Sequence, residues 1–130
     1  MFICELHNTD YESINTIMHE LSIATSIIKT TENEVRDNGG EKVLEIHLEI
    51  GKLSGVELQS LLFIWELSTK ETVLQDSKLT ITEPEGMAQC AECETEFALE
   101  KIYDSCPKCD SPFKTILSGK ELKIKKLIIN

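Results

Sequence analysis

Four cysteines in the second half of the chain have the types and spacing of a metal site. They form two C-x-x-C pairs, "CAEC" and "CPKC", separated by twelve residues: Cys90, Cys93, Cys106 and Cys109. Two such pairs can supply four thiolates to one Zn²⁺ ion, which accepts a tetrahedral sulfur shell at about 2.3 Å. Redox-active dithiols, or cysteines buried as small apolar residues, are the alternatives, and the spacing favours zinc over both. Because cysteine fills all four positions, no coordination site remains for water or substrate, and we expect a structural zinc.

A second candidate for metal chemistry is the internal triplet Met18-His19-Glu20. A single histidine near the start of a helix is most often a polar surface residue, and a role as base or ligand is the minority case. The triplet alone therefore indicates little. The cysteine pairs downstream and the segments that surround the triplet are the further evidence for a metal-binding role of His19.

The segments around these residues predict helices and strands. Residues 18–38 carry apolar side chains at steps of three and four, which is typical of one helix face, and Gly39 and Gly40 end the helix. Its expected buried residues are Leu21, Ala24, Ile27, Ile28, Thr31 and Val35. The segment "VLEIHLEI" (43–50) alternates apolar and polar residues, as a strand with one buried face does. The residues expected on its buried face are Leu44, Ile46, Leu48 and Ile50.

A second helix is expected to begin near Gly55, because Ser54 and Glu57 have the spacing of a capping box. Its expected buried stripe is Leu58, Leu61, Leu62 and Trp65. Two more strands are expected at "KLTIT" (78–82) and "ELKIKKLII" (121–129). The sequence thus predicts an α+β fold, with two helices packed on a small three-stranded sheet and a zinc-ribbon module inserted between two of the strands.

Composition and charge argue against several functional classes. The chain has 23 acidic and 13 basic residues, a formal net charge of −10, and such a polyanion repels the phosphate backbones of nucleic acids. No apolar run approaches the roughly 18 residues of a membrane span. The first seventeen residues contain no Lys or Arg, whereas an export signal begins with basic residues. We therefore expect a cytoplasmic protein with neither nucleic acid nor membrane as a partner.

Several segments occur together in a characteristic order: "MHELSIATSII", "EIHLEIGKLSGVE", "LLFIWE", the two cysteine pairs and "SGKEL". In this combination the chain resembles the HypA/HybF family of hydrogenase-maturation nickel metallochaperones. The resemblance runs from Met18 to the C-terminus. It implies an α+β nickel-binding domain formed by residues 18–86 and 118–130, a zinc-binding domain at 87–117, and an N-terminal extension at 1–17 that lies outside the family pattern.

The resemblance also implies roles for individual residues. The four cysteines fall on the family's structural zinc ligands, and His19 falls on its nickel-binding histidine. Met18 and Glu20 fall on the flanking positions, which can offer backbone nitrogen atoms to nickel. The implied protein is a metal-delivery protein rather than an enzyme, with Zn²⁺ as a structural ion and Ni²⁺ as cargo. Its implied partners are a maturation GTPase and the large-subunit precursor of a nickel-iron hydrogenase.

Two alternatives to this function belong to other classes. The first is a zinc-ribbon module that mediates protein interactions and has no nickel role. The second is a zinc-dependent hydrolase, which the closed shell of four cysteines disfavours because such enzymes keep a coordination position open.

Two features depart from the family pattern. In the family the methionine is the first residue and its free amine binds nickel, whereas here residues 1–17 precede Met18, which has an amide nitrogen instead. We expect Met18 to be the biological start; the alternative is that the extension is native and lengthens the first helix. The other departure is Asp110, where the family usually has glycine. A knuckle turn often needs a positive φ there, and Asp tolerates this better than most residues.

Other residues that can bind metals are expected to have ordinary roles. His47 lies between Glu45 and Glu49 on the polar face of a predicted strand, where a solvated side chain is the expected state. Cys4 and His7 lie in the extension and are expected to be a stray thiol and imidazole rather than ligands.

Overall fold

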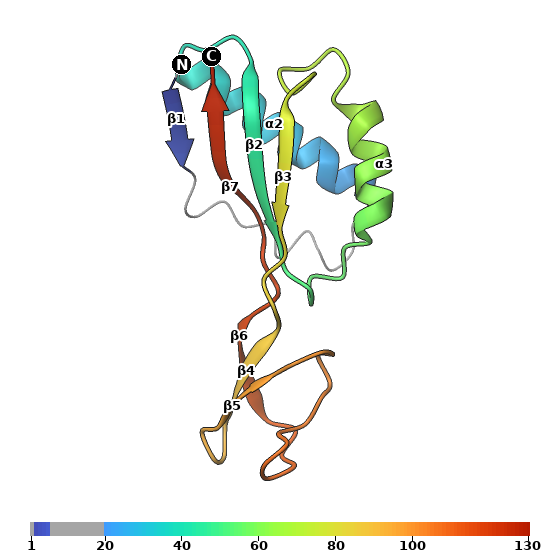
Figure 1. The fold of residues 1–130 in the computed structure, drawn as a ribbon, viewed down its shortest axis with the longest axis vertical. Coiled ribbons are helices and arrows are strands. Elements are labelled where there is room, and N and C mark those ends of the chain that lie inside the picture. Colours follow the sequence, from blue (N-terminus) through green and yellow to red (C-terminus); the bar gives the residue numbers. More distant parts are fainter. Residues whose placement is uncertain (1, 6–19) are drawn as a thin grey trace.

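The computed structural model describes residues 2–5 and 20–130 (Figure 1). Met18 and His19 therefore lie outside the described residues. In chain order the elements are β1 (Phe2–Glu5), α2 (Glu20–Asp37), β2 (Val43–Ile50), α3 (Leu58–Ser68), β3 (Lys78–Thr82), β4 (Met87–Cys90), β5 (Glu96–Ala98), β6 (Lys114–Ser118) and β7 (Leu122–Ile129). None of the helices in this described part is long and apolar enough to cross a membrane.

A four-stranded sheet and two helices form the larger part of the molecule. The strand order is β1-β7-β2-β3, in which β2 and β3 are parallel and the other neighbours are antiparallel. Helix α2 crosses behind the sheet, and α3 lies beside β3 (Figure 1). The predicted α+β fold class is confirmed. Strand β1 adds a fourth strand to the three that the sequence predicts, and it comes from the segment set apart as an extension.

The cysteine module is a separate three-stranded sheet at the other end of the elongated molecule (Figure 1). Its strand order is β5-β4-β6. The chain enters the module from β3 and returns to the larger sheet at β7, so two strand-to-strand connections lie side by side between the two parts.

The core between the helices and the larger sheet differs in detail from the predicted pattern. In α2 the buried residues are Ile23, Ala24, Ile27, Ile28, Thr31 and Val35, whereas Leu21 is 54% exposed. At about 100° per residue, Leu21 lies about 60° and Ile23 about 100° from the centre of the five buried positions that the predicted and observed sets share, so helical periodicity favours Leu21. Tertiary packing reverses this preference and buries Ile23 instead.

The second helix begins three residues later than the capping-box pattern predicts. Gly55 has a φ of +82°, which is incompatible with a helix, and the Ser54 hydroxyl accepts a hydrogen bond from Val56 N–H instead. Glu57 is the N-cap, because its carboxylate accepts a hydrogen bond from Gln59 N–H. Within α3, Leu61 and Trp65 are buried as predicted, but Leu62 is 43% exposed.

The pairing of strand β2 with β7 is irregular at two places, before Glu45 and between His47 and Leu48. Ile46, Leu48 and Ile50 face the core as predicted, but Val43 is buried while Leu44 is only half-buried. The pairing of β2 with β7 shifts between Val43 and Glu45. This irregularity breaks the strict alternation on which the prediction for Leu44 rests.

Candidate metal centre

The first cysteine pair lies on a tight turn that follows β4. Cys90 N–H donates to the Thr95 carbonyl (2.9 Å), and Glu94 N–H donates to the Cys90 carbonyl (3.1 Å). These bonds fold the chain back so that both thiols point to the same side. The turn requires a positive φ at Glu94 (62°), a conformation that residues other than glycine adopt at some cost.

The second pair repeats this geometry. Cys106 N–H donates to the Ser111 carbonyl (2.9 Å), and Asp110 N–H donates to the Cys106 carbonyl (2.8 Å). Asp110 has a φ of 63°, as expected for the position at which it departs from the family's glycine. The same requirement at Glu94 is not evident from the sequence pattern, although it follows from the equivalence of the two turns.

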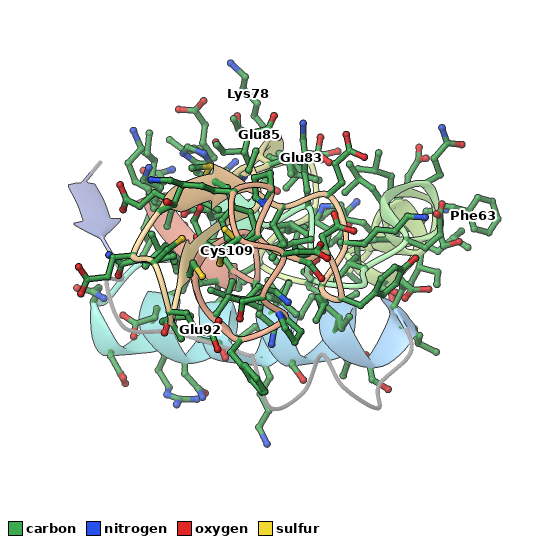
Figure 2. The ribbon with its side chains drawn as sticks, turned by 90° about the horizontal axis from the view of Figure 1, so that it is seen from below. Phe63, Lys78, Glu83, Glu85, Glu92 and Cys109 are labelled. Carbon is green, nitrogen blue, oxygen red and sulfur yellow. The ribbon has the colours of Figure 1, made fainter. Side chains whose placement is uncertain are left out.

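The two turns bring the four sulfur atoms together. All four lie within 4.8 Å of one another, with Cys90 Sγ 3.5 Å from Cys109 Sγ and Cys93 Sγ 3.7 Å from Cys106 Sγ. A tetrahedron with metal–sulfur bonds of about 2.3 Å has edges of about 3.8 Å, so these separations fit one zinc ion. Figure 2, which views the molecule from the module's end, shows Cys109 beside other sulfur atoms, in yellow. None of the four cysteines is in a disulfide.

Backbone hydrogen bonds in the first C-x-x-C turn favour the thiolate form of Cys90. The N–H groups of Cys93 and Glu92 each lie 3.4 Å from Cys90 Sγ. Their donation lowers the pKa of the Cys90 thiol, with the Cys93 N–H as the larger cause. A thiolate is the form that binds zinc, so the turn prepares the ligand for the metal.

Comparison of the chain with known proteins identifies its relatives. The family model described as "Hydrogenase/urease nickel incorporation, metallochaperone, hypA" matches residues 18–129. The chain belongs to the HypA family. The HypA hydrogenase maturation factor of Parabacteroides distasonis is 42% identical over 112 residues, which are 86% of this chain and 97% of the relative. The HypA factor of Pelodictyon phaeoclathratiforme is 40% identical, over 86% and 96% of the two chains.

A solved structure of the family has the same fold. The solution structure of the Ni metallochaperone HypA from Helicobacter pylori superposes with a TM-score of 0.65 at 26% sequence identity, and the match covers 86% of this chain and 97% of that one. Strand β1 lies outside the residues that the HypA family model matches.

The other residues singled out from the sequence do not join the cysteine site. Among the described residues, the four cysteines are the only group of three or more His, Cys, Asp or Glu side chains placed to share a metal ion. His47 is half-buried and hydrogen-bonds through Nε2 to the Thr82 hydroxyl on the neighbouring strand. Glu20, the one described residue of the triplet, is the first residue of α2.

Without a metal, four sulfur atoms this close together cannot all be ionised. Hydrogen bonding to the Thr95 side chain lowers the pKa of the Cys93 thiol to about 6, so this thiol is ionised at neutral pH. A hydrogen bond from the Ser111 backbone lowers the pKa of Cys109, but the interaction with Cys90 and desolvation outweigh it and raise the pKa to about 12. The metal-free site therefore retains a proton on Cys109 at neutral pH.

Zinc affinity should accordingly rise with pH. Zinc binds the thiolate and must displace the Cys109 proton, and because that pKa lies above the working range, each pH unit from about 6.5 to about 8.5 should strengthen binding at least about tenfold. Competition with a chromophoric chelator at several pH values measures this slope. A flat profile would mean that Cys109 is already ionised in the metal-free protein.

The metal-loaded protein should contain about one zinc ion per chain, surrounded by sulfur alone. Metal analysis gives the stoichiometry, and X-ray absorption at the zinc edge gives the donor atoms. We expect four sulfur atoms at about 2.3 Å. A first shell dominated by nitrogen or oxygen would contradict the assignment of all four cysteines.

Proposed function

We propose that this chain binds Ni²⁺ through the Met18-His19-Glu20 triplet and delivers it to a nickel enzyme during maturation. The observation that carries the proposal is the HypA family match, which begins at Met18 and includes both the triplet and the four cysteines. Imidazole and backbone nitrogen atoms suit Ni²⁺, which favours square-planar nitrogen sets. The closed shell of four cysteines supports a scaffold role for zinc rather than a catalytic one.

We further propose that the client is the large-subunit precursor of a nickel-iron hydrogenase, that a maturation GTPase assists the transfer, and that both encounters take place in the cytoplasm. The P. distasonis and P. phaeoclathratiforme relatives carry the name hydrogenase maturation factor, which supports this choice. In this role the chain carries metal and catalyses no reaction. A site at the chain surface with few ligands suits transfer, because it is easier to empty than a closed cage.

A nickel-transfer assay tests the proposal. Zinc-loaded protein that starts at Met18 is charged with one equivalent of Ni²⁺ and mixed with the hydrogenase precursor and the GTPase. His19→Ala should reduce nickel incorporation at least about a hundredfold, the factor that corresponds to about 2.8 kcal/mol of lost binding. His47→Ala is the matched control and should transfer nickel normally. Equal transfer by both variants would favour a zinc-ribbon interaction module without a nickel role.

A further inference from the structure

One residue of the helix-and-sheet part is buried in the core of the cysteine module. Leu53 lies in the loop between β2 and α3, and its side chain is only 7% exposed. It does not pack in the core under the helices. It belongs instead to the module's small apolar cluster, whose other buried members are Ala88, Cys90, Phe97, Leu99 and Cys106.

The backbone of the same loop is bonded to both connections between the two parts. Lys52 N–H donates to the carbonyl of Pro84, on the connection from β3 into the module (3.0 Å). Leu53 N–H donates to the carbonyl of Gly119, on the returning connection (2.6 Å). The loop therefore holds the entering and the leaving segments at once, beside the point at which Figure 1 shows them side by side.

The joint between the two parts is the place where residues 51–54 meet the connections that contain Pro84 and Gly119. Its glycines show how closely the chain segments approach one another. A Cβ atom at Gly51 would lie 2.0 Å from the carbonyl oxygen of Gly119, and one at Gly86 would lie 2.2 Å from the carbonyl oxygen of Leu99. The Leu53 side chain fills the space next to Gly86, where the same Cβ atom would approach its Cδ1 to 2.7 Å. The joint is thus packed backbone against backbone, with Leu53 between the segments.

An ion pair at the joint is too exposed to account for its stability. Lys52 Nζ lies 2.6 Å from Glu85 Oε1, but the two side chains are 49% and 73% exposed. Figure 2 shows Glu85 and Glu83 on the side of the molecule away from α2, near the surface. Exposed pairs of this kind contribute little, so the buried Leu53 side chain and the backbone bonds must hold the joint.

We propose that residues 51–54 form a clasp in which Leu53 is the positioning residue, and that the clasp fixes the orientation of the cysteine module against the helix-and-sheet domain. Two of the side chains that share a cluster with Leu53 are Cys90 and Cys106, which are zinc ligands in the assignment above. The apolar pocket around Leu53 is therefore complete only when both C-x-x-C turns are folded around the metal. Zinc occupancy closes the clasp, and zinc loss opens it.

The clasp does not depend on where nickel binds. It concerns the described residues alone, and its failure would leave the proposed nickel function untouched. If the metal-delivery function holds, a closed clasp presents the module and the start of α3 to a partner in one fixed arrangement.

NMR relaxation and amide exchange on the zinc-loaded full chain test the clasp. In the unmodified protein the module and the domain should tumble as one body, with slow exchange at the Lys52 and Leu53 amides. In Leu53→Ala the module should tumble separately, and exchange at positions 52 and 53 should accelerate at least about tenfold while the core amides of β2 and β7 stay protected. Leu53→Met retains an apolar side chain of similar volume and should restore both properties.

Matched variants separate a loosened clasp from a damaged module. Leu117→Ala removes the same atoms from a side chain of β6 that is 47% exposed, and it should leave tumbling and exchange unchanged. The visible spectrum of Co²⁺ bound in place of zinc reports whether the four-sulfur site is intact. Should Leu53→Ala lose that spectrum, Gly51→Ala provides the test, because it displaces the loop while the module keeps every one of its side chains.

The outcomes are distinct. Single-body tumbling and unchanged exchange in the variants that keep the cobalt spectrum would overturn the clasp. Chelator-treated unmodified protein should lose protection at positions 52 and 53 before it loses protection in β2 and β7. Full protection at positions 52 and 53 in zinc-free protein would overturn the link to zinc.

Discussion

Replacing Cys109 with alanine should unfold the cysteine module and leave the helix-and-sheet domain folded. Structural zinc sites contribute about 10–16 kcal/mol of apparent binding free energy, so the loss of one ligand in four should cost roughly 3–4 kcal/mol, or about 10²–10³-fold in zinc affinity. The module has little with which to offset this loss. Its buried cluster contains six residues, of which two are zinc ligands and one, Leu53, comes from outside the module.

The helix-and-sheet domain has an independent core. Within the described part of the chain, sixteen buried apolar residues form one cluster there, and none of them belongs to the cysteine module. Amide exchange should therefore show loss of protection in β4, β5 and β6 together, with protection retained in α2, β2 and β7. Cys4→Ala is the matched control, because it removes a cysteine that belongs to neither C-x-x-C pair. Uniform loss of protection along the whole chain would show that the two parts unfold as one unit.

The features that the sequence predicts well are those fixed by short-range chemistry. The two C-x-x-C pairs define the metal site because each turn sets the direction of its own thiols, and the structure only has to bring two such turns together. The positive φ of Asp110 is predictable for the same reason, because the geometry of the turn that it occupies requires it. The strand at 43–50 is also predicted from local pattern, because alternation from Ile46 to Ile50 buries one face, and only Val43 and Leu44 depart from it.

The features that the sequence does not predict depend on packing between distant segments. Leu53 lies in a short turn that resembles an ordinary helix entry. Nothing in the neighbouring residues indicates that its side chain is buried beside Cys90 and Phe97, which follow it by 37 and 44 residues in the sequence. The burial of Ile23 in place of Leu21 is decided by the sheet rather than by helical periodicity. The position of β1 at the edge of the sheet likewise depends on its partner β7, at the opposite end of the chain.

Nickel binding should depend jointly on the His19 imidazole and on a free amine at Met18, and three versions of the chain test this. The first starts at Met18, the second is the same chain with His19→Ala, and the third is the full 130-residue chain. The first should bind Ni²⁺ with the visible absorption of a square-planar nitrogen site. The second should bind at least about a hundredfold more weakly, since backbone nitrogen atoms without the imidazole are too weakly acidic to hold nickel at neutral pH.

The full chain separates the role of the amine from that of the imidazole. It keeps His19 and the Glu20 amide at the start of α2, but its Met18 nitrogen is part of a peptide bond. An amide gives up its proton far less readily than an ammonium group, so the full chain should bind nickel more weakly than the version starting at Met18 and show a different spectrum. Binding by all three should weaken as pH falls, because protons compete for every nitrogen donor. Equal affinity and identical spectra for the three versions would place nickel elsewhere, and a simultaneous loss of zinc on nickel addition would identify that place as the four cysteines.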